Sequence, residues 1–243
     1  MSSQVSSRPE DSHAEITAGP VQYAGQGAEI MAYLAQPAGS GPFPAVLVCH
    51  EIFGLTEHIK DVARRFAAAG YVALAVDLLS RDGGTARFAD IADIRAALQA
   101  APPAQFVEDF RAGLRYLQAQ SNVYAERIGM TGFCFGGGVT WRCATQIPEL
   151  KAVVPFYGPN PPLEDVPNIQ AAVLALYGEN DPRIMAGVPA IDEAMRQHGK
   201  IYEKVVYAGA EHGFHNDTGA RYHPEAAADA WKRMLAWFGK YLQ

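Results

Sequence analysis

The sequence predicts an α/β domain built on one mostly parallel, twisted sheet with helices on both faces. Residues 44–49 and 71–76 form nearly continuous apolar runs, as strands do when both faces of their sheet are covered. Amphipathic segments alternate with such runs, which is typical of parallel sheets with helical connections. With 243 residues and 49% hydrophobic composition, the chain can bury one large core. We therefore expect a single domain over residues 20–243, preceded by a flexible tail over residues 1–19.

The predicted elements follow one another from a leading hairpin to a last helix. Residues 20–24 and 29–36, joined through a glycine-containing turn, are expected to form antiparallel edge strands. Residues 172–177 and 201–207 indicate later strands, each followed by a polar loop. Helices are indicated where apolar side chains share one face: Ile59, Val62 and Phe66; Phe106, Phe110, Leu114 and Leu117; and Trp231, Met234, Leu235 and Phe238.

Composition disfavours several classes of protein. The formal net charge is −6 without basic blocks, which argues against nucleic acid because phosphate neutralisation supplies most of that affinity. No apolar run is long enough to cross a bilayer, and the polar first 19 residues lack the pattern of a secretory signal. The three cysteines are far apart and odd in number, which suits a reducing cytoplasm. We expect a cytoplasmic protein with a small-molecule partner, and the sequence leaves open whether it is a monomer or a homodimer.

A nucleophile-elbow pattern lies at residues 132–136, which read Gly-Phe-Cys-Phe-Gly, with sulfur in place of the usual serine oxygen. In an elbow the nucleophile occupies a strained strand-to-helix turn, where flanking glycines avoid collisions with the backbone. Cys134 is therefore the leading candidate for a catalytic nucleophile. The alternative is a buried cysteine whose neighbouring glycines merely end a strand.

Two polar residues downstream complete the chain order of α/β-type hydrolases, which is nucleophile, acid and then histidine. Asp181 follows the apolar run at 172–177, and His212 lies in the loop expected at residues 208–214. Ligands of open α/β sheets bind outside the carboxyl ends of the strands, so the three side chains can converge. Taken singly, a turn aspartate and a surface histidine are the simpler interpretations. The order of all three favours a triad.

Four segments together resemble the dienelactone hydrolase family: residues 50–54 (His-Glu-Ile-Phe-Gly), 132–137, 178–181 (Gly-Glu-Asn-Asp) and 212–214 (His-Gly-Phe). The resemblance implies a single-domain α/β-hydrolase fold, an enzyme that opens lactone rings, and a triad of Cys134, Asp181 and His212. It also implies a role for Glu51 near the thiol, where a carboxylate can hold or accept the proton. The alternative for Glu51 is an ordinary carboxylate at a helix start.

The predicted reaction requires no metal and no organic cofactor. The Cys134 thiolate attacks a lactone or ester carbonyl, and the oxyanion binds the backbone N–H groups of Ile52 and Phe135. Ring opening leaves a thioester, which water cleaves with His212 as general base, oriented by Asp181. Solvated or packed side chains are expected for four other histidines, which lack zinc-motif spacing: His50, His58, His215 and His223.

The resemblance further implies two arginines that hold a substrate carboxylate. Arg81 matches the first, with an ion pair to Asp82 as the alternative, and Asn216 occupies the position of the second. Because the amide is uncharged, other esters are expected to compete. Phe53 and Tyr157 are candidates for the pocket wall, and the short segment after Tyr157 leaves no room for a large lid. A broad esterase or thioesterase and a non-catalytic binding module are the alternative functions.

Overall fold

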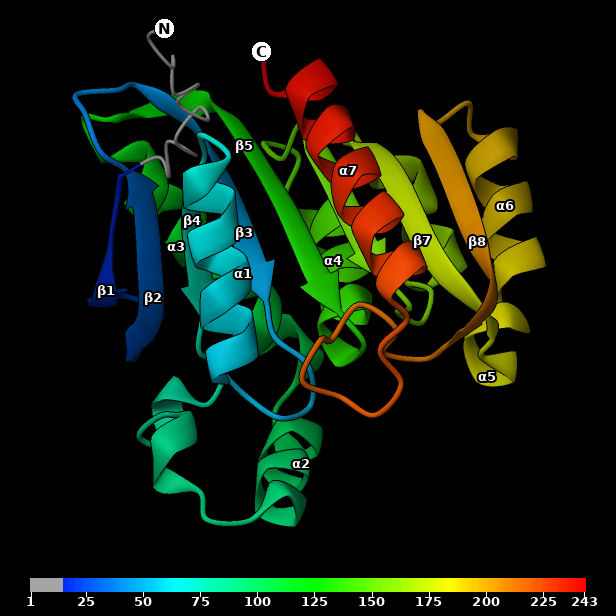
Figure 1. The fold of residues 1–243 in the computed structure, drawn as a ribbon, viewed down its shortest axis with the longest axis horizontal. Coiled ribbons are helices and arrows are strands. Elements are labelled where there is room, and N and C mark those ends of the chain that lie inside the picture. Colours follow the sequence, from blue (N-terminus) through cyan, green and yellow to red (C-terminus); the bar gives the residue numbers. More distant parts are fainter. Residues whose placement is uncertain (1–14) are drawn as a thin grey trace, which may run out of the picture.

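The computed structural model describes residues 15–243 and confirms the predicted α/β architecture (Figure 1). Eight strands form one sheet in the order β1-β2-β4-β3-β5-β6-β7-β8. The sheet is parallel from β4 to β8, and β2 joins β4 antiparallel. The strand bounds are β1 Ile16–Ala24, β2 Glu29–Pro37, β3 Phe43–Cys49, β4 Val72–Val76, β5 Val123–Phe133, β6 Ala152–Phe156, β7 Ala172–Asn180 and β8 Tyr202–Glu211.

The first and last strands differ in extent from their predictions. β1 and β2 form the predicted hairpin, but β1 begins at Ile16, so residues 16–19 belong to the sheet rather than to the tail. Residues 1–14 lie outside the described residues. β8 continues through Glu211, although residues 208–211 were predicted as loop, because it stays paired with β7 across a register shift. His212 therefore follows directly on the end of a strand.

Helices cover both faces of the sheet (Figure 1). Alternate side chains of β3 point to opposite faces, so Val48 joins the layer of Ile59 and Phe66, whereas Leu47 packs in the layer of Phe110. These apolar layers explain the nearly continuous apolar strands. One face carries α1 (Glu57–Ala68) and α7 (Pro224–Tyr241); the other carries α3 (Pro103–Gln118), α4 (Phe135–Gln146) and α6 (Val188–Gln197).

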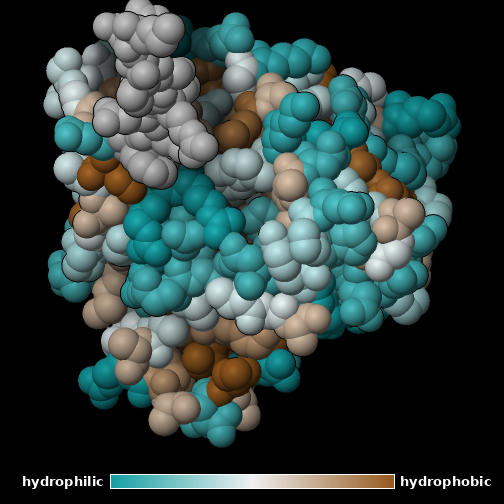
Figure 2. Space-filling model, in the orientation of Figure 1, coloured by the Kyte–Doolittle hydropathy of each residue, from teal (hydrophilic) through white to brown (hydrophobic). Residues whose placement is uncertain are grey.

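The segment between β4 and α3 projects beyond the carboxyl edge of the sheet (Figure 1). It contains two 3₁₀ helices, Ser80–Asp82 and Thr85–Arg87, followed by α2 (Ile91–Ala100). The Asp90 carboxylate caps α2 by accepting the backbone N–H of Ala92 at 2.7 Å. In the orientation of Figure 2, hydrophobic residues gather on this projection, whereas the surface over α1 is mostly hydrophilic. Its position makes α2 a wall for anything bound at the strand ends.

Two further short helices flank β7 in the sequence. A 3₁₀ helix, Leu163–Asn168, connects β6 to β7, and α5 (Pro182–Met185) begins directly after β7. No helix within residues 15–243 is long and apolar enough to span a membrane.

Candidate active site

Cys134 lies at the sharp turn between β5 and α4. Its backbone has φ 59° and ψ −117°, a strained conformation for a residue other than glycine. The turn is tight because residue 132 approaches residue 136: a Cβ on Gly132 would lie 2.2 Å from the carbonyl oxygen of Gly136. The Cys134 N–H donates to the Phe156 carbonyl at 3.1 Å and ties the turn to β6. This is the elbow that the glycine pattern predicts.

The structure brings the three candidate triad residues together at the carboxyl edge of the sheet. His212 Nε2 lies 3.0 Å from Cys134 Sγ, and His212 Nδ1 lies 2.5 Å from Asp181 Oδ2. Asp181 is buried, and its other oxygen accepts the backbone N–H of Ile184 in the first turn of α5. The residues follow β5, β7 and β8, three parallel strands whose carboxyl ends lie at the same edge of the sheet. An imidazole between a carboxylate and a thiol can accept a proton at one nitrogen while the other stays bonded.

The environment of the sulfur combines burial with nearby backbone donors. Burial raises the pKa of the Cys134 thiol, while the N–H groups of Phe135 and Ile52 lower it by donating toward the sulfur. The charge of Glu51 also raises this pKa, and that of Arg183 lowers it. Burial is the largest influence and raises the pKa overall, so a nearby base favours ionisation of this sulfur.

Glu51 follows β3 and is almost fully buried. Its Oε2 accepts a hydrogen bond from Asn216 Nδ2 at 2.7 Å. Burial raises the pKa of the Glu51 carboxyl, and the bond from Asn216 and the charge of Arg221 offset this only in part. The side chain that hydrogen-bonds the sulfur in this structure is His212. Glu51 is thus a nearby carboxyl with a high proton affinity.

A cavity of about 450 Å³ opens over the sulfur. The strand ends and the elbow contribute one side of it, and α2 contributes the other through Arg95, Leu98 and Gln99. The cavity is large enough for a small-molecule substrate. From the predicted site, the lining includes Glu51, Ile52, Phe53, Cys134, Phe135 and His212.

Three residues predicted for the substrate are placed elsewhere. The Arg81 guanidinium binds both oxygens of the buried Asp109 at 2.6 and 2.7 Å and the Gln26 carbonyl at 2.9 Å, so it is held in an ion pair away from the cavity. Asn216 is turned toward Glu51 and does not line the cavity. Tyr157 is fully buried, with its ring 5.1 Å from that of His212, so it supports the imidazole rather than the cavity wall.

The sequence reasoning missed three arginines that line the cavity. Arg95 lies on α2, a helix that was not predicted. Arg183 is two residues after Asp181, and this closeness to a predicted site residue could have indicated that it lies at the cavity. Arg221 lies in the loop between β8 and α7, where no local pattern indicates a direction for its side chain. None of the three forms an ion pair with another residue in the described part of the chain.

Of the other histidines, His50, His58 and His215 are buried. His50 Nε2 accepts the N–H of Leu78 at 3.2 Å, while its Nδ1 lies 2.6 Å from the carbonyl oxygen of Glu51. The His50 ring thus connects the backbone at Glu51 to the backbone at Leu78. Across residues 15–243, no group of three or more histidine, cysteine, aspartate or glutamate side chains is arranged to hold a metal ion.

Comparisons with known proteins identify the family of this chain. The model of the dienelactone hydrolase family matches residues 30–242. A protein of Methylorubrum extorquens named "Putative carboxymethylenebutenolidase" is 40% identical over 238 residues, covering 93% of this chain and 82% of the relative. A protein of the same name from Escherichia coli K12 is 36% identical over 254 residues, covering 99% of this chain and 92% of the relative.

Solved structures show the same likeness over nearly the whole fold. A structure titled as a "Putative Dienelactone Hydrolase" from Klebsiella pneumoniae has a TM-score of 0.87 and 38% identity, covering 93% of this chain and 100% of that one. A dienelactone hydrolase-like promiscuous phosphotriesterase from metagenomic libraries has a TM-score of 0.84 and 29% identity, with coverages of 93% and 98%. The chain therefore belongs to the dienelactone hydrolase family and is a carboxylic ester hydrolase.

Proposed function

We propose that the protein is a cysteine-dependent hydrolase that opens a lactone or small carboxylic ester through a thioester on Cys134. The observation that carries this proposal is the position of the His212 ring, 3.0 Å from the sulfur and 2.5 Å from the Asp181 carboxylate. A cavity above the sulfur gives a substrate access to it. An unreactive structural cysteine would need neither the imidazole nor the cavity.

In the first half of the reaction, His212 Nε2 accepts the thiol proton and the sulfur attacks the carbonyl carbon. The backbone N–H groups of Phe135 and Ile52 bind the oxyanion. The carbon–oxygen bond of the ester then breaks, and the leaving oxygen takes the proton from His212. The product of this half-reaction is a thioester. Asp181 keeps Nδ1 protonated and so keeps Nε2 free to accept a proton.

In the second half, a water molecule attacks the thioester carbonyl. His212 accepts a proton from this water and passes it to the sulfur as the thiol leaves. Glu51 is a second acceptor for the thiol proton, because burial raises the pKa of its carboxyl and places its proton affinity closer to that of a thiol. This role fits its place in the cavity wall beside the nucleophile.

The arginines of the cavity favour a substrate that carries negative charge. Arg95, Arg183 and Arg221 line the space around the sulfur and form no ion pair with any residue among 15–243. Such guanidinium groups can bind a carboxylate. A carboxylate-bearing lactone is therefore the preferred substrate in this proposal. The unpaired state of all three cysteines fits a cytoplasmic enzyme.

A broad-specificity esterase or thioesterase is the second candidate. It is favoured by the ion pair that occupies Arg81 and by the contact of Asn216 with Glu51, since neither side chain is available to orient a carboxylate. Comparing kcat/KM for a carboxylate-bearing dienelactone with that for p-nitrophenyl acetate separates the two. A dedicated lactonase prefers the lactone strongly, whereas a broad esterase does not.

Alkylation and turnover of Cys134→Ala test the proposed nucleophile. Iodoacetamide should modify only one cysteine of the folded protein, because Cys49 and Cys143 are fully buried. The modification should become faster as pH rises, because the thiolate is the reactive form. Cys134→Ala should lose this modification and at least about a thousandfold in kcat. In the unsubstituted enzyme, rapid quenching during turnover should reveal an acyl group on Cys134 by mass spectrometry.

The control for this test is Cys143→Ala, which removes a buried thiol outside the cavity and should retain the labelling and the kcat of the unsubstituted enzyme. Circular dichroism checks that each variant is folded. Turnover by folded Cys134→Ala at the original rate would exclude the thioester route.

A further inference from the structure

Three consecutive residues after the catalytic histidine form a turn that touches both Glu51 and α1. Asn216 donates to Glu51, Asp217 binds His58 and Arg65, and Thr218 donates back to Asn216. We call residues 216–218 the Glu51 clamp. The clamp sits only four residues beyond His212, so its geometry is coupled to that of the triad.

The side-chain amide of Asn216 is held in one orientation. Its Oδ1 accepts both the backbone N–H of Thr218 at 3.0 Å and the Thr218 hydroxyl at 2.7 Å. A backbone N–H can only donate, so it requires the oxygen of the amide on that side. The Nδ2 group is consequently directed at Glu51 Oε2, 2.7 Å away.

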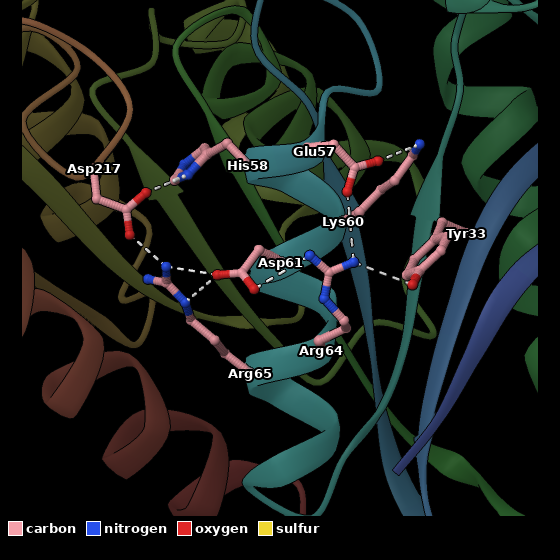
Figure 3. Close-up of polar contacts among 8 residues, drawn as sticks. All are labelled: Tyr33, Glu57, His58, Lys60, Asp61, Arg64, Arg65 and Asp217. Atoms are coloured by element: carbon pink, nitrogen blue, oxygen red, sulfur yellow. Dashed lines mark hydrogen bonds and ion pairs between the residues drawn. The ribbon is translucent and has the colours of Figure 1, made fainter.

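Asp217 fixes the clamp to α1, and Figure 3 shows its contacts with His58 and Arg65. The Asp217 carboxylate bonds the buried His58 ring through Oδ1, at 3.0 Å from Nδ1, and pairs with Arg65 through Oδ2. Asp61 holds the same Arg65 from one turn earlier in α1. With the backbone anchored in this way, rotation of the Asn216 amide is the main freedom left to the contact with Glu51.

We propose that Thr218 is a positioning residue that sets the hydrogen bond received by the buried Glu51 carboxyl beside Cys134, by fixing which end of the Asn216 amide faces it. The inference depends on the proposed function, in which Glu51 and His212 handle the thiol proton. A directed Nδ2–H group stabilises the carboxylate form of Glu51. A reversed amide presents an oxygen, which stabilises the protonated acid instead.

The charged and titratable groups that face Glu51 are few. Cys134 at the start of α4 and Tyr157 after β6 interact with it electrostatically, and Arg221 faces it from the loop that also carries the clamp. Tyr157 is fully buried, and burial raises the pKa of its hydroxyl well above the usual value, so it stays neutral. The hydrogen bond from Asn216 and the charge of Arg221 are therefore the two interactions that favour ionised Glu51.

The experiment compares Thr218→Val with Thr218→Ser in pH profiles of kcat/KM and of Cys134 alkylation. Thr218 is exposed, so the valine variant should fold normally. Loss of the hydroxyl leaves only the backbone N–H of Thr218 to hold the Asn216 amide. The protonated form of Glu51 should then be more populated, and the acid limb of both profiles should move to higher pH. On that limb we expect kcat/KM and the alkylation rate to fall by about threefold to tenfold, with little change at the plateau. Thr218→Ser, which keeps the donor, should restore the original profile.

Two further variants define the outcome. Asn216→Asp places a second carboxylate against Glu51 and should shift the acid limb in the same direction and further. Thr145→Val is the matched control, because the Thr145 hydroxyl bonds a carbonyl within α4, and its profile should match that of the unsubstituted enzyme.

Some results would overturn the positioning role alone. Superimposable profiles for Thr218→Val and the unsubstituted enzyme, with Cys134 still labelled, would do so, as would an equal loss at every pH that serine fails to rescue. Retained turnover in Cys134→Ala would instead overturn the proposed function itself.

Discussion

Glu51 is a buried carboxyl whose direct hydrogen-bonding partner is neutral. The Asn216 amide offers one N–H, while Arg221 acts on Glu51 only through its charge. Burial therefore prevails and raises the pKa of the carboxyl above its ordinary value. Ionisation of Glu51 therefore opposes folding.

Glu51→Gln should accordingly stabilise the protein at neutral pH and do so less at acidic pH. A group whose pKa is raised by folding favours the folded state below its unfolded pKa and loses that contribution as pH rises through the folded pKa. Glutamine does not titrate, and it retains an acceptor for Asn216. Thermal melts at about pH 4 and pH 8 measure the effect. An equal change in melting temperature at both pH values would contradict the raised pKa.

The convergence of Cys134, Asp181 and His212 could be predicted from the sequence, whereas the positions of Arg81 and Asn216 could not. Cys134, Asp181 and His212 each follow a strand, so the sequence order of short, directional side chains was sufficient to bring them together. Arg81 was misplaced because a long side chain reaches any partner within several ångströms, and here the buried Asp109 takes it. Asn216 was assigned to the substrate since nothing in the sequence indicates that Thr218 turns its amide toward Glu51.

At the scale of elements, the elbow depends on a contact between the start of α4 and the end of β6. Gly137 and Gly158 approach so closely that a Cβ on Gly158 would lie 2.2 Å from the carbonyl carbon of Gly137 and 2.4 Å from the Gly138 nitrogen. These atoms belong to backbone and cannot rotate away. The missing side chains let α4 begin at Phe135, directly after Cys134, so that the helix N-terminus lies at the cavity.

Gly158→Ala should therefore destabilise the protein and distort the site. We expect a loss of about 1–3 kcal/mol, the usual cost of overpacking, and a fall in melting temperature of about 2–10 °C. kcat should fall as well, because Cys134 and the Phe135 N–H move together with α4. Thermal melts and turnover measure both effects.

The matched control for this substitution is Gly19→Ala in β1. An added Cβ there meets no atom within 4 Å, so stability and turnover should be retained. A Gly158→Ala variant as stable as Gly19→Ala would show that the close approach is not needed for the fold.

Predicting elements from the sequence worked where a long apolar pattern existed. The strands and the larger helices bury continuous rows or stripes of side chains, and these have a clear period. α2 has only Ile94 and Leu98 buried, which is too short a stripe to distinguish it from a loop. The end of β8 was predicted too early for a similar reason. The small residues at 208–210 indicate a turn, but pairing with β7 overrides that preference.

At the scale of the whole molecule, the charge near the active site opposes the charge of the chain. The formal net charge is −6, yet the side chains around the cavity include Arg95, Arg183 and Arg221. A low-dielectric cavity focuses the field of such groups, so it can attract an anion that the rest of the surface repels. Paired surface charges, such as those on α1 in Figure 3, largely cancel one another.

The attraction of the cavity arginines for an anionic substrate should appear in the salt dependence of kcat/KM. For a carboxylate-bearing lactone, kcat/KM should fall by about twofold to tenfold as ionic strength rises from about 20 to 200 mM, because salt screens the attraction of the cavity. For a neutral ester of similar size it should change little. Arg95→Gln should reduce the slope for the lactone, whereas Arg127→Gln, which removes a charge packed on Tyr124 away from the cavity, should not. Equal slopes for the anionic and neutral substrates would mean that the arginines do not select for charge, and the broad-esterase candidate would then be preferred.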